Sequence, residues 1–303
     1  MKFPVKQLLL VLCAAATVYA LVLLFMADQP ALTLLQRLMS PAGLLAAALC
    51  VLSYVLRGLR WRHWMAHYQR PLGLLEGLRL YLAGYTFTPT PGNVGEAARG
   101  LLLARQPLGA AQSLSIFGAE RLADLVCLLL LTAPGLWWLL RLPAQASWLP
   151  ALAVAAGLFA LLGIVLLLKF SGPLLARYHW LRQAWQCLRT RPLTWLALTL
   201  VAWSAQGLAV WLVCVDNGLE ITIGVATGFY ALSMVGGALS MLPAGLGGME
   251  ALLTGLLVAH GASLGVAVAI TVSVRLLTLW LAVAIGAVAL FYSAAYKKDI
   301  RLS

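Results

Sequence analysis

The sequence predicts an all-α polytopic membrane protein with six full spans and two re-entrant helical hairpins in an inverted repeat, about eight membrane segments in all. Composition is the first reason, because 63% of the 303 residues are hydrophobic and only 10% are charged. Soluble domains are about half apolar and about a quarter charged. The mean hydropathy of +0.94 is the second reason. Together these observations exclude a soluble enzyme, a disordered chain and a fibrous protein, and they favour one integral membrane domain over residues 1–303.

Six apolar segments are candidates for spans, each of which needs about 20 residues. They cover residues 7–27, 41–56, 112–140, 148–168, 193–215 and 264–292. Residues 7–27 follow Lys2 and Lys6 and resemble a secretory signal, but many apolar segments follow. We therefore expect an uncleaved first span.

Two further apolar stretches, 72–104 and 221–260, are interrupted by proline and glycine. Proline lacks the amide hydrogen and breaks a helix, so each stretch is expected to stop and restart inside the membrane. We expect both to be re-entrant hairpins, although a hairpin that crosses fully twice fits equally well. The predicted gate or hinge residues are Pro89, Pro91, Gly92, Gly95, Pro243, Gly245, Gly247 and Gly248.

The distribution of Lys and Arg orients this topology. With the N-terminus inside and both hairpins re-entrant, 17 cations fall on the inner side and only Arg37 and Arg141 on the outer side. Cytoplasmic loops carry such an excess of cations. The net charge of +12 is thus explained by topology rather than by nucleic-acid binding, and both termini are expected to be cytoplasmic in a bacterial inner membrane.

An internal repeat is suggested by three residue types that are rare in apolar surroundings. At a constant offset of 154, Pro89, Glu96 and Arg121 recur as Pro243, Glu250 and Arg275. The two copies would be residues 1–141 and 148–296. Each holds three spans and one hairpin, and because three crossings is an odd number, the second copy should be inverted.

Ionisable residues inside a membrane are costly and are functional candidates by default. The predicted substrate-binding residues are Glu96, Glu120, Arg121, Asp124, Glu250 and Arg275. Four acids against two arginines leave an excess of two negative charges, which makes protonation of an acid, and hence proton coupling, plausible.

Structural roles compete with binding at each of these positions. Glu96 and Glu250 follow Asn93 and Gly247 with the spacing of a capping box, so each can simply cap a helix. Arg121 and Asp124 are three residues apart and can pair on one helix. Arg275 has no acidic neighbour on its own helix and needs a partner from another element, or an anionic ligand.

Two basic segments are expected at the inner surface. Residues 57–64 are expected to be a basic, aromatic extension of the second span. They place Arg60 and Arg62 among tryptophans, which indicates topological anchoring or contact with anionic headgroups, a role also expected for Arg99. Residues 173–192 fit an amphipathic helix on the membrane surface. No metal site is expected: His63 and His67 have helical spacing, but no third ligand accompanies them. We expect no cofactor either.

Three segments together resemble the lysylphosphatidylglycerol synthetase transmembrane-domain family, a flippase-like family that is also described as an uncharacterised inner-membrane family. They are Tyr85 with residues 89–99, the motif Glu120-Arg121-Leu122-Ala123-Asp124, and residues 243–250. The resemblance covers nearly the whole chain. It implies a domain that flips an aminoacylated phospholipid made by an attached synthase, but the chain ends at Ser303 soon after the last span, so we expect no aminoacyl transfer.

These observations lead to one expectation for function. We expect a non-enzymatic lipid flippase or transporter whose arginines hold the phosphate of an anionic phospholipid, an aminoacylated lipid or a polyprenyl-phosphate glycolipid. Membrane lipids are the expected partners, with a lipid- or glycan-synthesising enzyme as a candidate. The alternatives are a membrane subunit or scaffold for such an enzyme, and an embedded enzyme that acts on lipid headgroups.

Overall fold

The computed structural model describes residues 31–100, 107–141, 178–240 and 242–302, where all regular structure is helical. Within these ranges, four helices are long and apolar enough to cross a membrane: Pro41–His67, Ala110–Leu140, Pro192–Asp216 and Leu264–Ser293. Two shorter apolar helices are Ile223–Leu239 and Gly248–Ala259. The chain is thus a helical, multi-pass membrane protein. The predicted spans 7–27 and 148–168 lie outside the described residues.

Helix α2 (Ala31–Leu38) leads into α3 (Pro41–His67), which is longer than predicted. Ser40 caps α3 by accepting a hydrogen bond from the Gly43 amide at 3.1 Å. The predicted basic, aromatic extension of this span over residues 57–64 is confirmed, and α3 continues three residues further to His67. Trp61 and Trp64 lie on that extension and are 2% and 0% exposed, so packing rather than membrane depth sustains it.

The first broken segment comprises α4 (Leu74–Gly84), the short turn η1 (Tyr85–Phe87) and η2 (Pro91–Ala97). Pro91 lies in the first turn of η2, where a missing amide hydrogen does no harm. Helices α5 (Ala110–Leu131) and α6 (Ala133–Leu140) follow as one nearly continuous rod with Pro134 near the joint.

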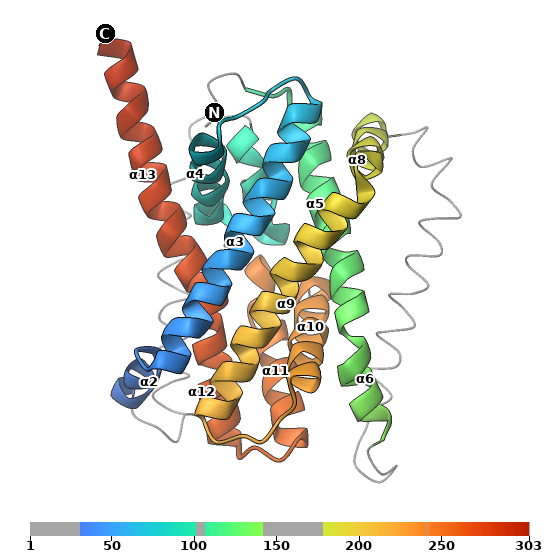
Figure 1. Cartoon of the computed structure of the whole chain (residues 1–303), viewed down its shortest axis with the longest axis vertical. Coiled ribbons are helices and arrows are strands. Elements are labelled where there is room, and N and C mark those ends of the chain that lie inside the picture. Colours follow the sequence, from blue (N-terminus) through green and yellow to red (C-terminus); the bar gives the residue numbers. More distant parts are fainter. Residues whose placement is uncertain (1–30, 101–106, 142–177, 241, 303) are drawn as a thin grey trace.

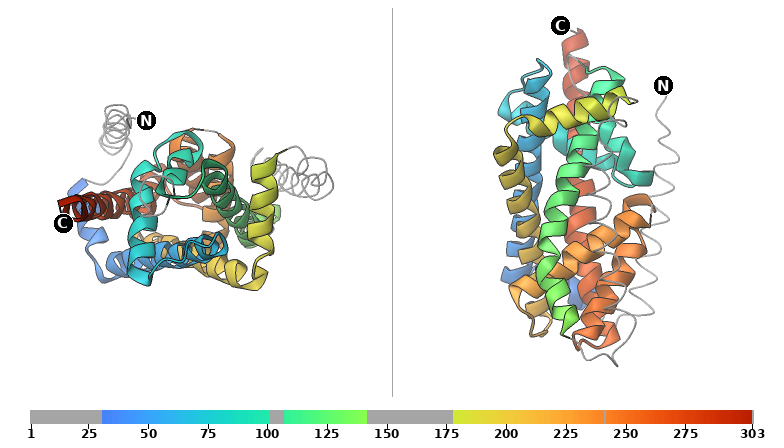
Figure 2. Two further views of the ribbon diagram at one scale, coloured as in Figure 1. Left: turned by 90° about the horizontal axis from the view of Figure 1, so that it is seen from above. Right: turned by 90° about the vertical axis from the view of Figure 1, so that its right-hand side faces the viewer.

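Helix α8 (His179–Arg189) lies across one end of the bundle (Figure 2). It buries Ala184 and Cys187 and packs on α5, which agrees with the predicted amphipathic helix over the part of residues 173–192 that the structure describes.

The second half begins with α9 (Pro192–Asp216), which packs along α3. A second broken segment follows, made of α10 (Ile223–Leu239), η4 (Pro243–Gly245) and α11 (Gly248–Ala259). The last rod comprises α12 (Leu264–Arg275), the π-helical turn η5 (Leu276–Trp280) and α13 (Leu281–Leu302).

The two broken segments occupy opposite halves of the bundle. The α4–η1–η2 segment lies in the upper half, and α10 and α11 lie in the lower half (Figures 1 and 2). Both α10 and α11 have their outer ends at the lower end of the bundle. The two breaks meet in the interior, where η2 contacts η4.

The helix boundaries share the spacing seen in the sequence. Helix α5 begins at Ala110 and α12 begins at Leu264, which is the same 154-residue offset that relates Arg121 to Arg275. In Figure 1, α5 and α6 run downward while α12 and α13 run upward, and α3 and α9 also run in opposite directions. Each of these two pairs of helices therefore has members that run in opposite directions.

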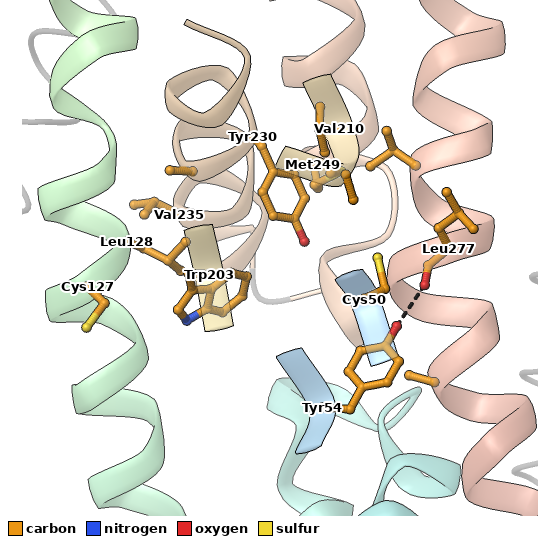
Figure 3. Packing of buried hydrophobic residues seen from close by; sticks show 14 of the residues in the cluster. Cys50, Tyr54, Cys127, Leu128, Trp203, Val210, Tyr230, Val235, Met249 and Leu277 are labelled. Atoms are coloured by element: carbon orange, nitrogen blue, oxygen red, sulfur yellow. Dashed lines mark hydrogen bonds between the residues drawn. The ribbon is translucent and has the colours of Figure 1, made fainter. Parts of the chain in front are cut away.

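The core joins the two halves through buried aromatic residues. The Tyr54 hydroxyl of α3 donates to the Leu277 carbonyl of η5 at 2.7 Å (Figure 3). That carbonyl lies in the π-helical turn, where the regular hydrogen-bond pattern is shifted. Outward-facing positions are also apolar, as expected where lipid replaces water. Exposed examples from three helices are Leu44, Leu45, Leu52, Leu193, Val201, Val288 and Phe291.

Close packing of α6 on α10 depends on two glycines. A Cβ atom added at Gly228 would lie 2.7 Å from the Cα of Gly135. Backbone atoms cannot move aside as a side chain does, so we expect Gly228→Ala to destabilise the protein by about 1–3 kcal/mol. Gly255→Ala is the matched control, because nothing lies within 4 Å of its added Cβ. Thermal unfolding in detergent should show a lower midpoint for the first variant alone, and equal midpoints would contradict this packing.

Candidate functional site

Arginines and carboxylates from three elements converge inside the bundle. Helix α3 contributes arginines three residues apart, η2 and the turn after it contribute a glutamate and an arginine, and α5 contributes the Glu-Arg-x-x-Asp motif. We call these seven residues the charge cluster: Arg57, Arg60, Glu96, Arg99, Glu120, Arg121 and Asp124. Residues three or four apart on a helix share one face, which explains why α3 and α5 each present more than one charge.

Arg60 lies at the centre of the cluster and is 0% exposed. Its Nη1 atom donates to Asp124 Oδ1 and to Thr199 Oγ1, both at 2.8 Å. Its Nη2 atom lies 3.9 Å from Glu120 Oε1. Because an unpaired buried charge costs several kcal/mol, these carboxylates are what allows Arg60 to be buried.

Arg99 joins the first break to α5. Its Nη2 atom donates to Glu96 Oε2 at 3.0 Å and to Glu120 Oε2 at 3.1 Å, and its Nε donates to the Glu96 carbonyl at 2.9 Å. The guanidinium carbon lies 4.4 Å from the ring centroid of Tyr81. Arg99 is 1% exposed. Its hydrogen bonds to Glu96 and Glu120 hold the first broken segment against α5.

Arg121 is the accessible cation of the cluster, with 35% of its side chain exposed. Its Nη2 atom lies 3.2 Å from Asp124 Oδ2 and 3.7 Å from Glu96 Oε2, and its Nε atom has no hydrogen-bond partner. The pairing of Arg121 with Asp124 was predicted from their spacing and is confirmed. Arg121 still has donor capacity for a ligand.

The charge cluster carries one more cation than anions, since it holds four arginines and three carboxylates. The predicted excess of two negative charges is therefore wrong. The cause is that Arg57, Arg60 and Arg99 were counted as surface cations and are buried instead, at 7%, 0% and 1% exposure. With cations in excess, the cluster does not require a protonated acid.

In the second half, Arg275 is 3% exposed and holds the second break closed. Its Nε donates to Glu250 Oε1 at 2.8 Å, and its Nη2 donates to the carbonyls of Ala244 and Gly245 at 3.2 and 3.3 Å. Glu250 and Arg275 thus pair, just as Glu96 and Arg121, each 154 residues earlier, approach each other at 3.7 Å. The partner that Arg275 lacked on its own helix comes from α11.

The comparison with protein families agrees with this architecture. The model of the lysylphosphatidylglycerol synthase TM region matches residues 9–286. The chain belongs to this family. A relative is the UPF0104 membrane protein of Methanothermobacter thermautotrophicus, which is 31% identical over 103 residues. That match covers 34% of this chain and 30% of the relative, so the chain spans less than a third of that protein's length in the match.

Within this lysylphosphatidylglycerol synthase TM region, the two predicted capping glutamates differ. Glu250 caps α11 as predicted, because its Oε2 accepts from the Gly247 amide at 2.8 Å. Glu96 does not cap η2, whose N-cap residue is Thr90. Glu96 instead accepts from Thr88 Oγ1 at 2.9 Å and pairs with Arg99. Glu96 thus binds side chains of its own segment and approaches Arg121 of α5 instead of capping the turn.

The three arginines that are predicted to contact lipid headgroups differ in burial. Arg60 and Arg99 are buried in the charge cluster, so the prediction that they contact headgroups at the membrane surface is wrong for this conformation. Arg62 remains partly exposed and donates from Nε to the Leu72 carbonyl at 2.6 Å, and its role at the headgroups stays a prediction.

The predicted hinge residues shape both breaks of this family member. Gly247 has φ +86° and Gly245 has φ +65°, a region that favours glycine, and Gly245 lies against the backbone of Gly237. In the first break, a Cβ at Gly95 would lie 2.8 Å from the Cβ of Phe87. The chain is therefore bent at these positions, whereas the role of all eight predicted residues as gates or moving hinges stays a prediction.

Proposed function

We propose that this protein translocates a lipid with an anionic headgroup across the membrane, and that Arg121 is the first residue to hold the headgroup phosphate. The observation that carries the proposal is the charge cluster, which has one cation in excess. Arg121 is its only substantially exposed arginine. Buried cations without enough counter-charge favour an anionic ligand. Arginine suits a phosphate because its planar fork forms two parallel hydrogen bonds. Candidate lipids are an anionic phospholipid, an aminoacylated lipid or a polyprenyl-phosphate glycolipid.

The two halves form an inverted repeat in this proposal, and the broken segments are re-entrant hairpins that dip in from opposite faces. The shared offset of 154 residues, the opposite directions of α5 and α12, and the contact between η2 and η4 support this arrangement. Inverted repeats with broken helices near the midplane are a recurring transporter architecture. With the cation-rich end inside, the protein lies in a bacterial inner membrane with both termini cytoplasmic.

The proposed cycle exchanges internal ion pairs for ligand contacts. Arg121 releases Glu96, its more distant carboxylate at 3.7 Å, and takes up the phosphate. On the other side, Arg275 exchanges Glu250 for the headgroup, which frees the carbonyls of the second break and lets its glycines rotate. The carboxylates hold the arginines when the site is empty. In this scheme they perform no catalytic chemistry, and the protein is a transporter rather than an enzyme.

The test is a headgroup panel in proteoliposomes. Phosphatidylglycerol and phosphatidylcholine, each with a fluorescent acyl chain, are placed in the inner leaflet, and external dithionite measures their appearance outside. We expect the purified protein to accelerate the anionic lipid more than the zwitterionic one, relative to protein-free vesicles. Equal rates with and without protein for every lipid in the panel would overturn the proposal.

A further inference from the structure

Arg57 is a buried cation without a carboxylate partner in the described part of the chain. It is 7% exposed and lies ten residues before the end of α3 at His67, or about 15 Å at 1.5 Å per residue. Seven of the nine acids in the sequence have described side chains, and none of these forms an ion pair within 4.0 Å of Arg57. Asp124, which acts on it at longer range, is already held by Arg60 and Arg121.

The contacts that Arg57 does make are neutral. Its Nη2 donates to Gln206 Oε1 at 3.0 Å, and its guanidinium carbon lies 3.9 Å from the ring centroid of Trp203. Its Nε has no hydrogen-bond partner. A cation–π contact and one amide oxygen replace only part of the hydration that a guanidinium loses, so Arg57 retains capacity for an anion.

A second donor points at the same oxygen. The Tyr230 hydroxyl of α10 donates to Gln206 Oε1 at 2.9 Å, so Arg57 and Tyr230 converge on one neutral acceptor. Trp203 and Tyr230 lie in the core between α5 and the last rod (Figure 3). The three residues come from α3, α9 and α10, so they join one member of the charge cluster to two helices of the second half.

We propose that Arg57, Gln206 and Tyr230 form a second anion-binding site that takes a phosphate group with a single negative charge. A phosphate oxygen accepts from Arg57 and Tyr230 where the Gln206 oxygen now does, and a second oxygen accepts from the free Nε of Arg57. One negative charge equals the one cation in excess in the charge cluster. A phosphodiester headgroup has that charge, whereas a free phosphate monoester approaches two at neutral pH.

The role of this site in transport rests on the proposed function, whereas binding at the site does not. In this role the second site holds the headgroup phosphate inside the bundle, after Arg121 has bound it and before Arg275 does. A lipid that crosses would then meet one cation after another instead of the bare hydrocarbon barrier.

Gln206→Glu tests the site, because it places a carboxylate where the ligand oxygen is expected and leaves Arg57 in position. We expect the empty variant to unfold at a higher temperature than the wild type, since the buried cation gains a partner. We also expect its affinity for lysophosphatidylglycerol, measured as ligand-dependent thermal stabilisation in detergent, to fall about tenfold or more. Gln186→Glu, the same change at an exposed position of α8, should alter neither property.

The outcomes separate the two proposals. If the wild type translocates lipid but Gln206→Glu keeps its affinity within tenfold, or unfolds at a lower temperature, the second site is wrong and the proposed function stands. If no lipid is translocated but the affinity falls as expected, the site stands and the function fails. Glycerol phosphate and lysophosphatidylcholine are run beside lysophosphatidylglycerol. Stabilisation by glycerol phosphate alone would show a soluble anion as the ligand and would overturn the lipid assignment.

Discussion

Asp124→Asn is expected to destabilise the protein by about 3–5 kcal/mol, the cost of removing one partner from a buried ion pair. Asp124 neutralises Arg60 at 2.8 Å and Arg121 at 3.2 Å, and it accepts from Trp203 Nε1 at 3.3 Å. An asparagine has the same shape and keeps an acceptor, but it supplies no charge. Arg60 is 0% exposed and cannot reach water without unpacking α3 from α9.

Reversible unfolding in a denaturant titration measures this loss. Glu220→Gln, an equivalent charge removal at an exposed position, is the control and should change stability by less than about 0.5 kcal/mol. Adding Arg60→Met to Asp124→Asn should recover part of the loss, because the uncompensated cation is then absent. If the single Asp124→Asn variant is as stable as the wild type, Asp124 does not neutralise Arg60 and Arg121 in the folded protein.

Arg121→Gln is expected to lower translocation of labelled phosphatidylglycerol by about 10- to 100-fold. A hydrogen bond to a charged group contributes about 1.5–3 kcal/mol, which corresponds to that range of rates. Its side chain is 35% exposed, so its loss should not unfold the protein as loss of Arg60 would. Arg121→Lys keeps the charge without the planar fork and should have an intermediate rate.

Arg141→Gln provides the matched control for this variant. Arg141 is also an exposed arginine, it stacks on Trp137 at 4.7 Å, and it caps the C-terminal end of α6, away from the charge cluster. Its variant should translocate at the wild-type rate in vesicles with the same protein content. If Arg121→Gln and Arg141→Gln are equally active, Arg121 does not hold the headgroup.

The breaks and the pair of Arg121 with Asp124 could be predicted from the sequence, because their signals are local. Proline and glycine in an apolar segment mark the breaks, and the spacing of Arg121 and Asp124 places them on one helix face. The partner of Arg275 could not be predicted in this way, because Glu250 lies on α11 and Arg275 on α12, and only the structure brings the two helices together.

The location of Arg57 and Arg60 could not be predicted from hydropathy. A window that counts charges ends the span at residue 56, and it assigns both arginines to the inner surface. Their partners Asp124, Thr199 and Gln206 lie more than 60 residues away in sequence. A weak local signal was present, since Leu59, Trp61, Trp64 and Met65 continue an apolar pattern between the arginines, which is typical of a helix buried by other helices.

The central claim is that an arginine of the charge cluster binds a lipid phosphate inside the membrane. A cryo-electron microscopy map of the protein in phosphatidylglycerol nanodiscs tests it most directly. We expect phosphate density within hydrogen-bond distance of the Arg121 guanidinium, with the Glu96 contact lengthened beyond its present 3.7 Å. Lipid density confined to the outer surface, with Arg121 still held by Glu96 and Asp124 as in the empty protein, would contradict the claim.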